Sequence, residues 1–349
     1  MGAGIFGLAC AWECVRRGAR VQVIERDRIG AGSSGGFVGA LAPHVPENWN
    51  AKKAFQLDSL LMAGRFWAEI GEVSGTDPGY ARSGRLQPVG DQGALALARQ
   101  RAQWAEELWA DKANWQVVPE TDFSDWRPLS GTGMLVHDSL TARIHPRKAA
   151  LALAAAIRAN GGCIEEHRSE PPAGIFEKRR NAGVILWATG VQGLADLSAD
   201  LGRSVGSGVK GQAALLVHDA RSLPQIFADG LHIVPHGDGT VAVGSTSERE
   251  FGCGSDTDNR LEDLISRARR LCPALADAPV KERWAGIRPR SKTRSPMLGE
   301  WPNRPGHFVA NGGFKIGYGM APKVAVVIAD LVLEGRDAIP DGFRVQDNL

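Results

Sequence analysis

Several kinds of protein are excluded by what this sequence contains little of. Its 349 residues include only five cysteines, and no two of them form a CxxC pair. Such scattered thiols argue against a disulfide framework and against a zinc site, so we expect reduced cysteines, no metal ligands and a cytoplasmic location. No stretch approaches the ~18 consecutive apolar residues of a membrane-spanning helix, so we expect no membrane span.

An excess of one charge is also missing. The 41 lysines and arginines nearly balance the 39 aspartates and glutamates, which gives a net charge of +2. Proteins that bind nucleic acid usually carry a clear basic excess, so the composition argues against RNA or DNA as a partner. The first residues of the chain are mostly apolar, but they include Glu13 and no basic start, which argues against a secretory signal peptide.

Glycine, by contrast, is abundant: 43 residues are glycine, about 12% against a usual ~7%. Three of them form a GxGxxG motif at Gly2, Gly4 and Gly7, and an apolar strand over 21–24 follows and ends at Glu25. In a dinucleotide site such glycines bring a helix N-terminus close to a pyrophosphate, and an acid ~20 residues further on binds a ribose. We therefore predict dinucleotide binding; the alternative is a chance glycine turn beside a surface carboxylate.

The position of this motif in the chain is unusual. A dinucleotide motif normally follows the first, central strand of its sheet, but here it begins at Met1. We therefore expect the first strand to be missing from this chain. Our hypothesis is a misassigned start, with Met1 in place of the last residue of that strand, and sequencing the natural N-terminus would test it.

The rest of the chain predicts alternating helices and strands. Apolar residues recur at helical spacing over 51–72, 93–109, 146–160, 257–271 and 322–334. Short apolar or alternating runs predict strands over 83–89, 115–118, 134–137, 184–189, 211–217, 230–235 and 240–244. A glycine- and serine-rich loop over 27–50 is long for a compact domain, which indicates a functional loop; the alternative is a mobile surface segment.

Taken in order and spacing, the motifs resemble the family of FAD enzymes that includes D-amino-acid oxidase, glycine oxidase and sarcosine oxidase. The resemblance spans nearly the whole chain and rests on GAGIFG with VIER, GAGSSGGFVGAL, SGRLQPV, HPRKAALALAAAIRANGG, VILWATG, GVKGQAALL, HIVPHGDGTVAVGST, WAGIRP and NGGFKIGYGMAP. It implies an α/β fold in which an FAD-binding Rossmann-like domain of the glutathione-reductase type is interleaved with an α+β substrate domain on a mostly antiparallel sheet. We expect the FAD-binding domain to comprise 1–80, 138–203 and 304–349, and the substrate-binding domain 81–137 and 204–303.

The resemblance also implies which residues contact FAD. Relatives with a covalent flavin use a histidine in the loop 33–39 or a cysteine near Gly286, and this sequence has neither, so we expect noncovalent FAD. The cofactor-binding residues that it implies are Gly2, Gly4, Ile5, Phe6, Gly7, Glu25, Arg26, Ser33, Ser34, Val38, Gly39, Ala40, Thr189, Gly190, Gly313, Phe314, Lys315, Ile316, Gly317, Tyr318 and Gly319.

Two cations are the catalytic candidates. Arg288, in the GIRP motif, matches the family position that binds the substrate carboxylate, and the planar fork of an arginine suits that pairing. The alternative for this residue is a structural ion pair. Lys315 stands where glycine oxidase has an arginine. It would supply charge to the substrate carboxylate or to reduced flavin without bidentate geometry, and the alternative is a plain surface lysine.

These features predict an FAD-dependent amine or amino-acid oxidase or dehydrogenase. A small amino acid or N-substituted glycine would lose its Cα hydrogen as a hydride to flavin N5, and the resulting imine would hydrolyse in water. The expected partners are this small molecule and an electron acceptor, either oxygen or a quinone. The sequence indicates no oligomeric state.

Three alternatives stay open at this point. Residues 35–43 (GGFVGALAP) also resemble the C-terminal oxidoreductase half of the bacterial enzyme that modifies the tRNA wobble uridine. That resemblance would make the substrate a carboxymethylaminomethyl nucleoside in tRNA. The second alternative is a flavin-binding protein without turnover. The third is an NAD(P)-binding dehydrogenase, which the strand ending in ATG and the GGFKIG loop do not favour.

Overall fold

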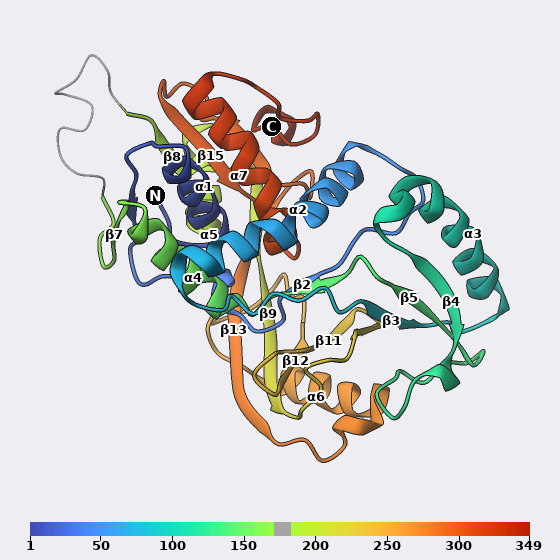
Figure 1. Ribbon diagram of the computed structural model, residues 1–349. Coiled ribbons are helices and arrows are strands. Elements are labelled where there is room, and N and C mark those ends of the chain that lie inside the picture. Colours follow the sequence, from blue (N-terminus) through green and yellow to red (C-terminus); the bar gives the residue numbers. More distant parts are fainter. Residues whose placement is uncertain (171–182) are drawn as a thin grey trace.

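The computed structural model describes residues 1–170 and 183–349, which form a layer of helices on short parallel strands and, beside it, a large mixed sheet (Figure 1). The helices are α1 (Ile5–Arg16), α2 (Ala51–Ser74), α3 (Gln92–Trp109), α4 (Pro146–Ala159), α5 (Gly190–Asp200), α6 (Asn259–Leu271) and α7 (Gly317–Glu334). The strands are β1 (Gln22–Ile24), β2 (Ala40–Leu41), β3 (Arg85–Pro88), β4 (Trp115–Pro119), β5 (Met134–Asp138), β6 (Ala142–Arg143), β7 (Cys163–Glu165), β8 (Ile185–Trp187), β9 (Gly206–Val217), β10 (Gln225–Ala228), β11 (Leu231–Pro235), β12 (Thr240–Gly244), β13 (Val280–Ser291), β14 (Met297–Glu300) and β15 (His307–Asn311). Short 3-10 turns are η1 (Ser33–Gly35), η2 (Ala110–Lys112), η3 (Glu120–Asp122), η4 (Pro273–Leu275) and η5 (Gln346–Asn348).

The smaller sheet consists of two pieces with the start of the chain between them. β1 pairs in parallel with β7, and β8 pairs in parallel with β15, whose other neighbour is the antiparallel β14. The Met1 amine donates to the Leu186 carbonyl at 2.8 Å, and the Ala188 N–H donates to the Met1 carbonyl at 2.9 Å. On the other side, the Gly2 N–H donates to the Ile24 carbonyl at 2.7 Å. In the described residues no strand precedes α1, and these two residues take the place of the expected central strand.

Four helices pack together on this layer because each turns an apolar side inward. α1 packs against α7 and α4, and α2 packs against α7 and α4. Leu8 and Trp12 of α1, Leu60 and Trp67 of α2, and Leu153 of α4 are all less than 5% exposed. Burial of side chains of this size contributes about 2 kcal/mol each, so this core holds the first turn of α1 firmly in place.

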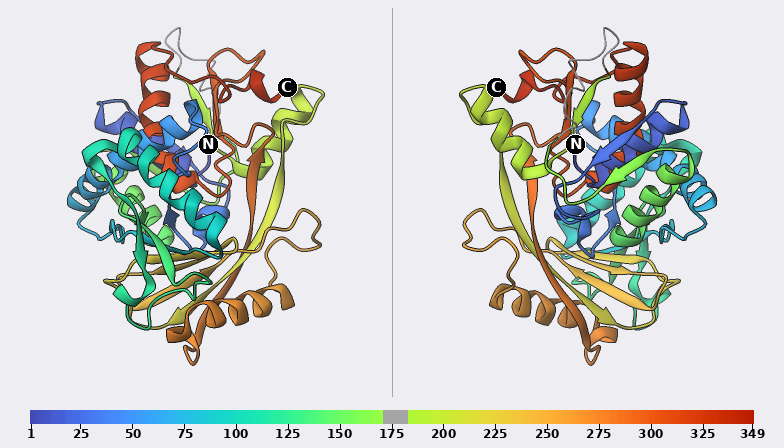
Figure 2. Two further views of the ribbon diagram at one scale, coloured as in Figure 1. Left: turned by 90° about the vertical axis from the view of Figure 1, so that its right-hand side faces the viewer. Right: turned by 90° about the vertical axis from the view of Figure 1, so that its left-hand side faces the viewer.

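The large sheet has the strand order β13-β9-β12-β11-β10-β3-β5-β4. All its neighbours are antiparallel except β10 and β3. Side chains alternate along β9: Ala214 and Leu216 pack in the cluster with α6, whereas Ala213 and Leu215 pack with Phe37. α6 thus covers one face of the sheet, and the other face is turned toward the helical layer (Figure 2).

The structure confirms most predicted elements and corrects two boundaries. The helices predicted over 51–72, 93–109, 146–160 and 257–271 all begin and end within two residues of their predicted positions. α7, however, begins at Gly317 and not at Pro322, which is instead inside the helix. The prediction was wrong because proline favours the first turn, and here the chain becomes helical before it. β9 begins at Gly206 rather than 211, because it pairs with β13 along its whole length.

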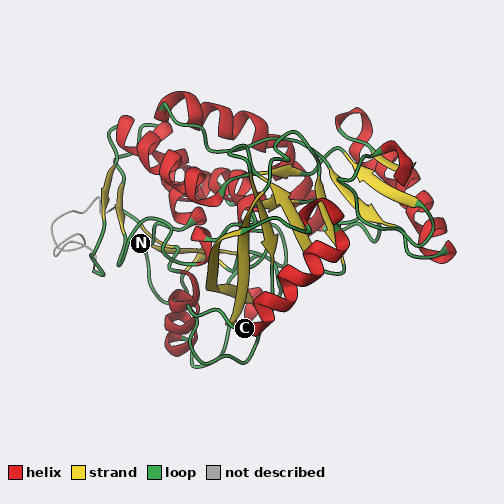
Figure 3. Cartoon of the chain, turned by 90° about the horizontal axis from the view of Figure 1, so that it is seen from below, coloured by secondary structure: helices red, strands yellow, loops and turns green. Residues whose placement is uncertain are grey.

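Helices lie around the strands when the molecule is seen from below (Figure 3). None of the helices in the described part of the chain is both long and apolar enough to cross a membrane. Over the same ranges, no three His, Cys, Asp or Glu side chains are placed to hold a metal ion.

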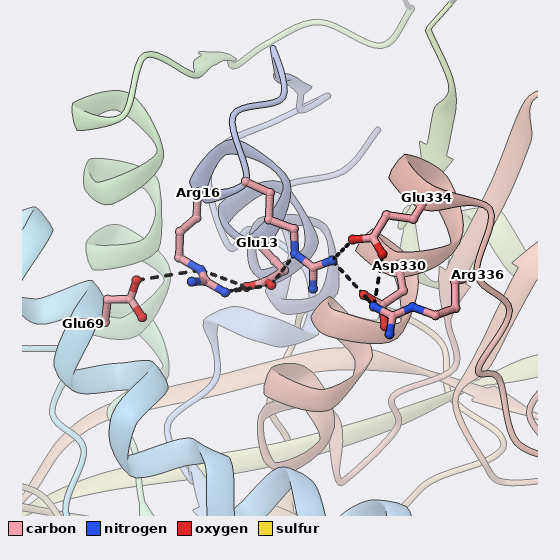
Figure 4. Close-up of polar contacts among 7 residues, drawn as sticks. Glu13, Arg16, Glu69, Asp330, Glu334 and Arg336 are labelled. Carbon is pink, nitrogen blue, oxygen red and sulfur yellow. Dashed lines mark hydrogen bonds and ion pairs between the residues drawn. The ribbon is translucent and has the colours of Figure 1, made fainter.

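Charged side chains join α1 to α7 near their C-terminal ends. Glu13, which is 2% exposed, accepts hydrogen bonds from Arg16 and Arg17 at 2.8 and 2.7 Å. Arg17 also donates to Asp330 of α7 at 2.7 Å, and Arg336 pairs with the same carboxylate at 2.8 Å (Figure 4). Because the acids are buried and each has two basic partners, the cluster fixes the position of α1 against α7.

Candidate active site

A cavity of about 900 Å³ lies between the helical layer and the large sheet. Its wall includes the first turns of α1, α5 and α7, most of the segment 31–40 and residues 284–289 of β13. The glycine motif at the start of the chain, the ATG turn after β8 and the loop before α7 therefore meet at one place, although they are far apart in the sequence.

Three helix N-termini open onto this cavity without side-chain caps. α1, α5 and α7 begin after Gly4, Thr189 and Ile316, and none of these residues forms a capping hydrogen bond with its side chain. The first N–H groups and the dipole of each helix favour an anion at such a place. One of these N–H groups, that of Ile5, donates to the Ser34 hydroxyl at 2.9 Å and so joins α1 to the loop beside it.

Close backbone contacts explain two glycines of the N-terminal motif. Gly2 has φ +95°, and a β-carbon there would lie 2.5 Å from the Ala188 carbonyl oxygen. A β-carbon on Gly7 would lie 2.0 Å from the Gly2 carbonyl oxygen. Both positions therefore require glycine, and Gly7 serves the packing of α1 rather than the cavity wall.

Glu25 presents its carboxylate to one end of the cavity. The carboxylate accepts hydrogen bonds from the backbone N–H of Ala3 at 2.7 Å and of Asp27 at 2.9 Å. These bonds fix its orientation and leave further lone pairs for hydroxyl donors. Arg26 and Arg168 line the same part of the wall. This end of the cavity suits a ribose next to an anionic group.

Tyr318 lines the cavity, but its hydroxyl is already engaged. The hydroxyl oxygen lies 2.8 Å from the carbonyl oxygens of both Ser34 and Pro146. Burial raises the pKa of this phenol far above its ordinary value, so it stays neutral. Tyr318 thus holds the wall of the cavity in position and is not a free acid or base.

Phe37 anchors the cavity loop on the large sheet. It is 1% exposed, meets the Trp284 ring edge-on at 6.5 Å between ring centroids, and has the Arg147 guanidinium 4.5 Å from its own centroid. The Nε2 atom of His236 lies 2.8 Å from the Phe37 carbonyl oxygen. Burial lowers the pKa of His236 to about 4, so the ring is neutral at pH 7 and Nε2–H donates to that carbonyl.

Arg288 lies at the opposite end, on the face of β13 that lines the cavity. Its side chain crosses β9 over Gly211 and donates to the Thr246 carbonyl at 3.3 Å. Arg288 is 8% exposed, and none of the ion pairs in the described residues includes it. Burial lowers its pKa to about 10 against the opposing effect of Glu248, so it remains protonated at neutral pH. A buried cation of this kind is set up to receive an anion.

Glu248, the acid whose charge opposes the lowering of the Arg288 pKa, forms its hydrogen bonds with other residues. Glu248 accepts hydrogen bonds from the Gln212 amide at 3.0 Å and from Arg260, near the start of α6, at 2.8 Å. The Gln212 N–H donates to the Thr246 hydroxyl at 2.8 Å, and the Thr246 N–H donates to the Gln212 carbonyl at 3.2 Å. This network holds the carbonyl that Arg288 contacts and keeps the carboxylate away from the cavity.

Lys315 places a second cation at the same end. It lines the cavity and is exposed, and its Nζ lies 5.8 Å from the centroid of the Phe314 ring. Arg290 approaches the same ring, with its Cζ 5.7 Å from the centroid. Desolvation at the cavity wall and, after it, the charge of Arg288 lower the pKa of Lys315, so both cations contribute positive potential to this end of the cavity.

Two further residues of the wall were not anticipated from the sequence. The Nδ1 atom of His232 is buried and has no hydrogen-bond partner among the described residues. Burial, together with the charges of Arg85 and Lys315, lowers the pKa of His232 to about 3, so it is neutral. Trp284 lies on the cavity face of β13, four residues before Arg288. The alternation of a strand through Arg288 would have placed Trp284 there, but the register of β13 was not assigned.

The structure brings most of the predicted site residues together. Those that line the cavity are Arg288, Lys315, Gly2, Gly4, Ile5, Phe6, Glu25, Arg26, Ser33, Ser34, Val38, Gly39, Ala40, Thr189, Gly190, Gly313, Phe314, Gly317 and Tyr318. Gly7, Ile316 and Gly319 are not part of its lining. A β-carbon on Gly319 would lie 3.4 Å from the Leu60 side chain, so this glycine packs α7 against α2.

A cavity with an anion-binding end and a buried guanidinium at the other is typical of an enzyme that brings a dinucleotide cofactor to a small acid. The model of one family, the FAD dependent oxidoreductases (DAO), matches residues 1–331. The chain belongs to this family and is an FAD-dependent oxidoreductase. This finding confirms the resemblance noted in the sequence and leaves no place for the NAD(P) alternative.

Known relatives extend this finding. The chain is 26% identical over 366 residues to a glycine oxidase from Geobacillus kaustophilus, covering 95% of this chain and 91% of the relative. It is 28% identical over 360 residues to a glycine oxidase from Pseudomonas aeruginosa, covering 98% and 95%. The crystal structure of glycine oxidase from Geobacillus kaustophilus superposes with a TM-score of 0.83 at 23% identity, covering 99% and 96% of the two chains. The predicted α/β fold is thereby confirmed.

The residues of the cavity fit FAD. Uncapped helix N-termini suit its pyrophosphate, and the oriented carboxylate of Glu25 suits its ribose. The loop beside them has a glycine where a side chain would fill the space: a β-carbon on Gly36 would lie 3.1 Å from the Trp284 ring. The buried hydroxyl of Thr189 lines the cavity and lacks a partner among the described residues.

Proposed function

We propose that this enzyme uses FAD to oxidise the CH–NH bond of a small amino acid or N-substituted glycine, whose imine product then hydrolyses. The observation that supports this substrate class is the buried, protonated Arg288 in the cavity wall, which has no acid among the described residues at ion-pair distance. A substrate carboxylate would meet its guanidinium as a bidentate pair, which fixes the substrate in one orientation. The glycine oxidases among the relatives fit the same class.

The chain would hold FAD without a covalent bond. Phe6 and Gly190 would bind the pyrophosphate through backbone N–H groups, with Ile5 beside it and its own N–H on the Ser34 hydroxyl. Glu25 would accept hydrogen bonds from the adenosine ribose. Ser33 and Ser34 would lie along the phosphates. The remaining predicted contacts that line the cavity would surround the isoalloxazine, namely Val38, Gly39, Ala40, Gly313, Phe314, Lys315, Gly317 and Tyr318. Bound FAD supplies the two-electron acceptor for the Cα hydrogen.

At the substrate end the chain would orient and stabilise rather than act as a base. Arg288 would bind the carboxylate, so that the Cα–H points toward the cofactor. Lys315 and the first N–H groups of α7 would supply positive potential for the substrate carboxylate or the reduced flavin. His232 is neutral and its Nδ1 has no partner in the described ranges, which would make it a hydrogen-bonding neighbour for the substrate rather than a third cation.

The proposal also covers the domain organisation, the location and the reaction partners of the enzyme. We propose two interleaved domains, with 1–80, 138–203 and 304–349 holding FAD and 81–137 and 204–303 carrying the substrate site. Free cysteines agree with a cytoplasmic location. The electron acceptor would be oxygen or a quinone, and a small amine or amino acid rather than nucleic acid would be the substrate.

A visible spectrum of the purified protein under anaerobic conditions tests this function. The spectrum is recorded before and after adding amino acids and N-methylglycines one at a time. We expect an oxidised flavin spectrum that bleaches with at least one of them. A flavin that stays oxidised with every one would contradict the proposed reaction, and a colourless protein that takes up no added FAD would contradict the cofactor assignment.

Replacing the arginine tests the substrate end separately. Arg288→Ala should chiefly raise KM for carboxylate substrates, by about 10- to 100-fold, because a charge-assisted hydrogen bond contributes about 1.5–3 kcal/mol. Arg288→Lys should recover part of this loss, since it restores the charge without the fork. An unchanged KM in Arg288→Ala would remove this residue from the site.

A further inference from the structure

Cations continue from Arg288 toward the surface along one side of the cavity. Arg288 and Arg290 are two residues apart on β13, so their side chains leave the strand on the same face. Both Arg290 and Lys315 approach the ring of Phe314, since the Arg290 Cζ lies 5.7 Å and the Lys315 Nζ 5.8 Å from the ring centroid. Because Phe314 and Lys315 line the cavity, these cations border the substrate end.

Two more arginines extend this cluster. Arg249 and Arg294 are exposed and lie close to Arg290. The pKa of Arg290 is lowered first by its own desolvation and then by the positive charges of Arg294 and Arg249. We call Arg249, Arg290, Arg294 and Lys315 the basic rim. Its members come from three segments, namely the residues after β12, the end of β13 with the turn that follows, and the loop before α7. The fold therefore assembles the rim at one end of the cavity.

Within the part of the chain that the structure describes, no acid pairs with the basic rim. None of the ion pairs found over residues 1–170 and 183–349 includes a member of it. Glu248, the acid whose charge acts on the pKa of Arg288, is engaged by Arg260 of α6 at 2.8 Å. Cations held close together repel one another, and an anion that binds among them relieves that repulsion.

We propose that the basic rim binds a second anionic group of the substrate. The substrate would be a dianionic amino acid or N-substituted glycine, with one carboxylate on Arg288 and another carboxylate or a phosphoryl group between Arg290 and Lys315. The Phe314 ring, which both cations approach, would contact the carbons that join the anions. A monocarboxylate would pair with Arg288 only and would leave the positive charges of the basic rim without a counter-ion. This inference rests on the proposed function and narrows its substrate class.

Two amines that differ only at the far end of the molecule provide the kinetic test. N-methylglycine and N-(carboxymethyl)glycine present the same α-carbon and secondary amine to the holoenzyme. We expect kcat/KM to be at least about tenfold higher for N-(carboxymethyl)glycine at low ionic strength, and the ratio to shrink in 0.5 M salt. Arg290→Met should lower the ratio by about tenfold, whereas Arg99→Met, on an exposed position of α3 and with the same loss of charge, should preserve it.

Binding without turnover separates this inference from the proposed function. Malonate and acetate are titrated into the oxidised holoenzyme, and the flavin spectrum reports both dissociation constants. Tighter binding of malonate that is lost in Arg290→Met supports the rim even if no amine bleaches the flavin, in which case only the proposed function fails. Equal binding of the two acids, or equal kcat/KM for the two amines, overturns the inference. The inference is also overturned if the holoenzyme binds transfer RNA but binds malonate no more tightly than acetate.

Discussion

The guanidinium of Arg288 occupies the space where a side chain on Gly211 would begin. A β-carbon on Gly211 would lie 1.9 Å from Nη1, 2.0 Å from Nη2 and 2.1 Å from Cζ of the arginine. The two residues belong to neighbouring strands, and the side chain of Arg288 reaches the Thr246 carbonyl only by crossing this glycine. Gly211 is therefore part of what positions the proposed carboxylate-binding group, although it need not touch the substrate.

Gly211→Ala should displace Arg288 without unfolding the strand, because alanine fits an extended backbone. We expect KM for a carboxylate substrate to rise by about 10- to 100-fold, as in Arg288→Ala, with little change in the bound FAD. Steady-state kinetics and the flavin-to-protein absorbance ratio measure the two effects.

A double variant shows whether the two substitutions act through one group. In Gly211→Ala with Arg288→Ala, KM should be no higher than in Arg288→Ala alone, because the arginine has already been removed. Gly252→Ala is the control, since a β-carbon there meets no atom within 4 Å. Additive losses in the double variant would mean that Gly211 affects the site by another route.

Gly39→Ala should weaken FAD binding. Gly39 has φ +58°, and a β-carbon there would lie 1.9 Å from the Ile144 carbonyl oxygen. The Ile144 N–H donates to the Gly39 carbonyl at 2.9 Å, so the substitution would push the loop off its support. Left-handed backbone alone costs a non-glycine residue about 1–2 kcal/mol, so we expect at least about a tenfold higher Kd for FAD.

Fluorescence titration of the FAD-free protein with FAD measures this dissociation constant. Gly90→Ala is the matched control, because a β-carbon at that position has open space around it. An unchanged Kd in Gly39→Ala would show that the loop adapts and does not set the width of the cavity.

The fold could be predicted from the sequence where local patterns carry it. The helix α4 was located within one residue because proline at its start and the apolar spacing of its alanines and leucines act over a few residues. The strand β13 was not recognised, since Trp284, Gly286 and Arg288 face the cavity and the strand therefore lacks a plain apolar stripe. The strand predicted at the position of its partner β9 was too short. The first residues of β9 are small and also lack an apolar pattern, and they form a strand because they pair with β13.

The candidate site likewise has one part that local sequence patterns predict and one part that they do not. The N-terminal glycine motif and Glu25 form a local unit, and their arrangement around the first turn of α1 could be predicted from spacing alone. The other end depends on contacts between strands that are remote in sequence. Nothing in the spacing shows that Gly211 lies beneath Arg288, or that His232 faces the same cavity, because strand register decides both.

Stability should fall on acidification below pH 6.5 because of His236. Burial lowers its pKa to about 4 in the folded protein, whereas an unfolded histidine has a pKa of about 6.5. Between these values the unfolded state binds a proton that the folded state does not, so the free energy of unfolding decreases as the pH falls from 6.5 to 4. Between pH 7 and pH 5 this one group accounts for about 2 kcal/mol.

Urea unfolding at the two pH values, with wild type and His236→Asn, isolates this contribution. Asparagine keeps an N–H donor for the Phe37 carbonyl but takes up no proton. The loss of stability between pH 7 and pH 5 should be smaller by about 2 kcal/mol in the variant. Equal losses in the two proteins would show that His236 is protonated in the folded state at pH 5.

Arg17→Met should destabilise the protein more than Arg16→Met. Arg17 is the partner shared by Glu13 and Asp330, whose side chains are only 3% and 8% exposed. Removing it leaves two buried carboxylates with weaker partners, and breaking such buried pairs costs about 3 kcal/mol. Arg16 also pairs with Glu13, but its side chain is 40% exposed, so its loss should cost less than about 1 kcal/mol.

Urea unfolding of the three proteins at pH 7 compares these free energies. Both variants should keep FAD under native conditions, because the cluster lies near the C-terminal ends of α1 and α7, whereas the cavity lies at their N-terminal ends. Retained flavin in Arg17→Met would show that the two ends of α1 can be perturbed separately. Equal destabilisation by the two substitutions would mean that the buried bridge between α1 and α7 contributes no more than the exposed pair within α1.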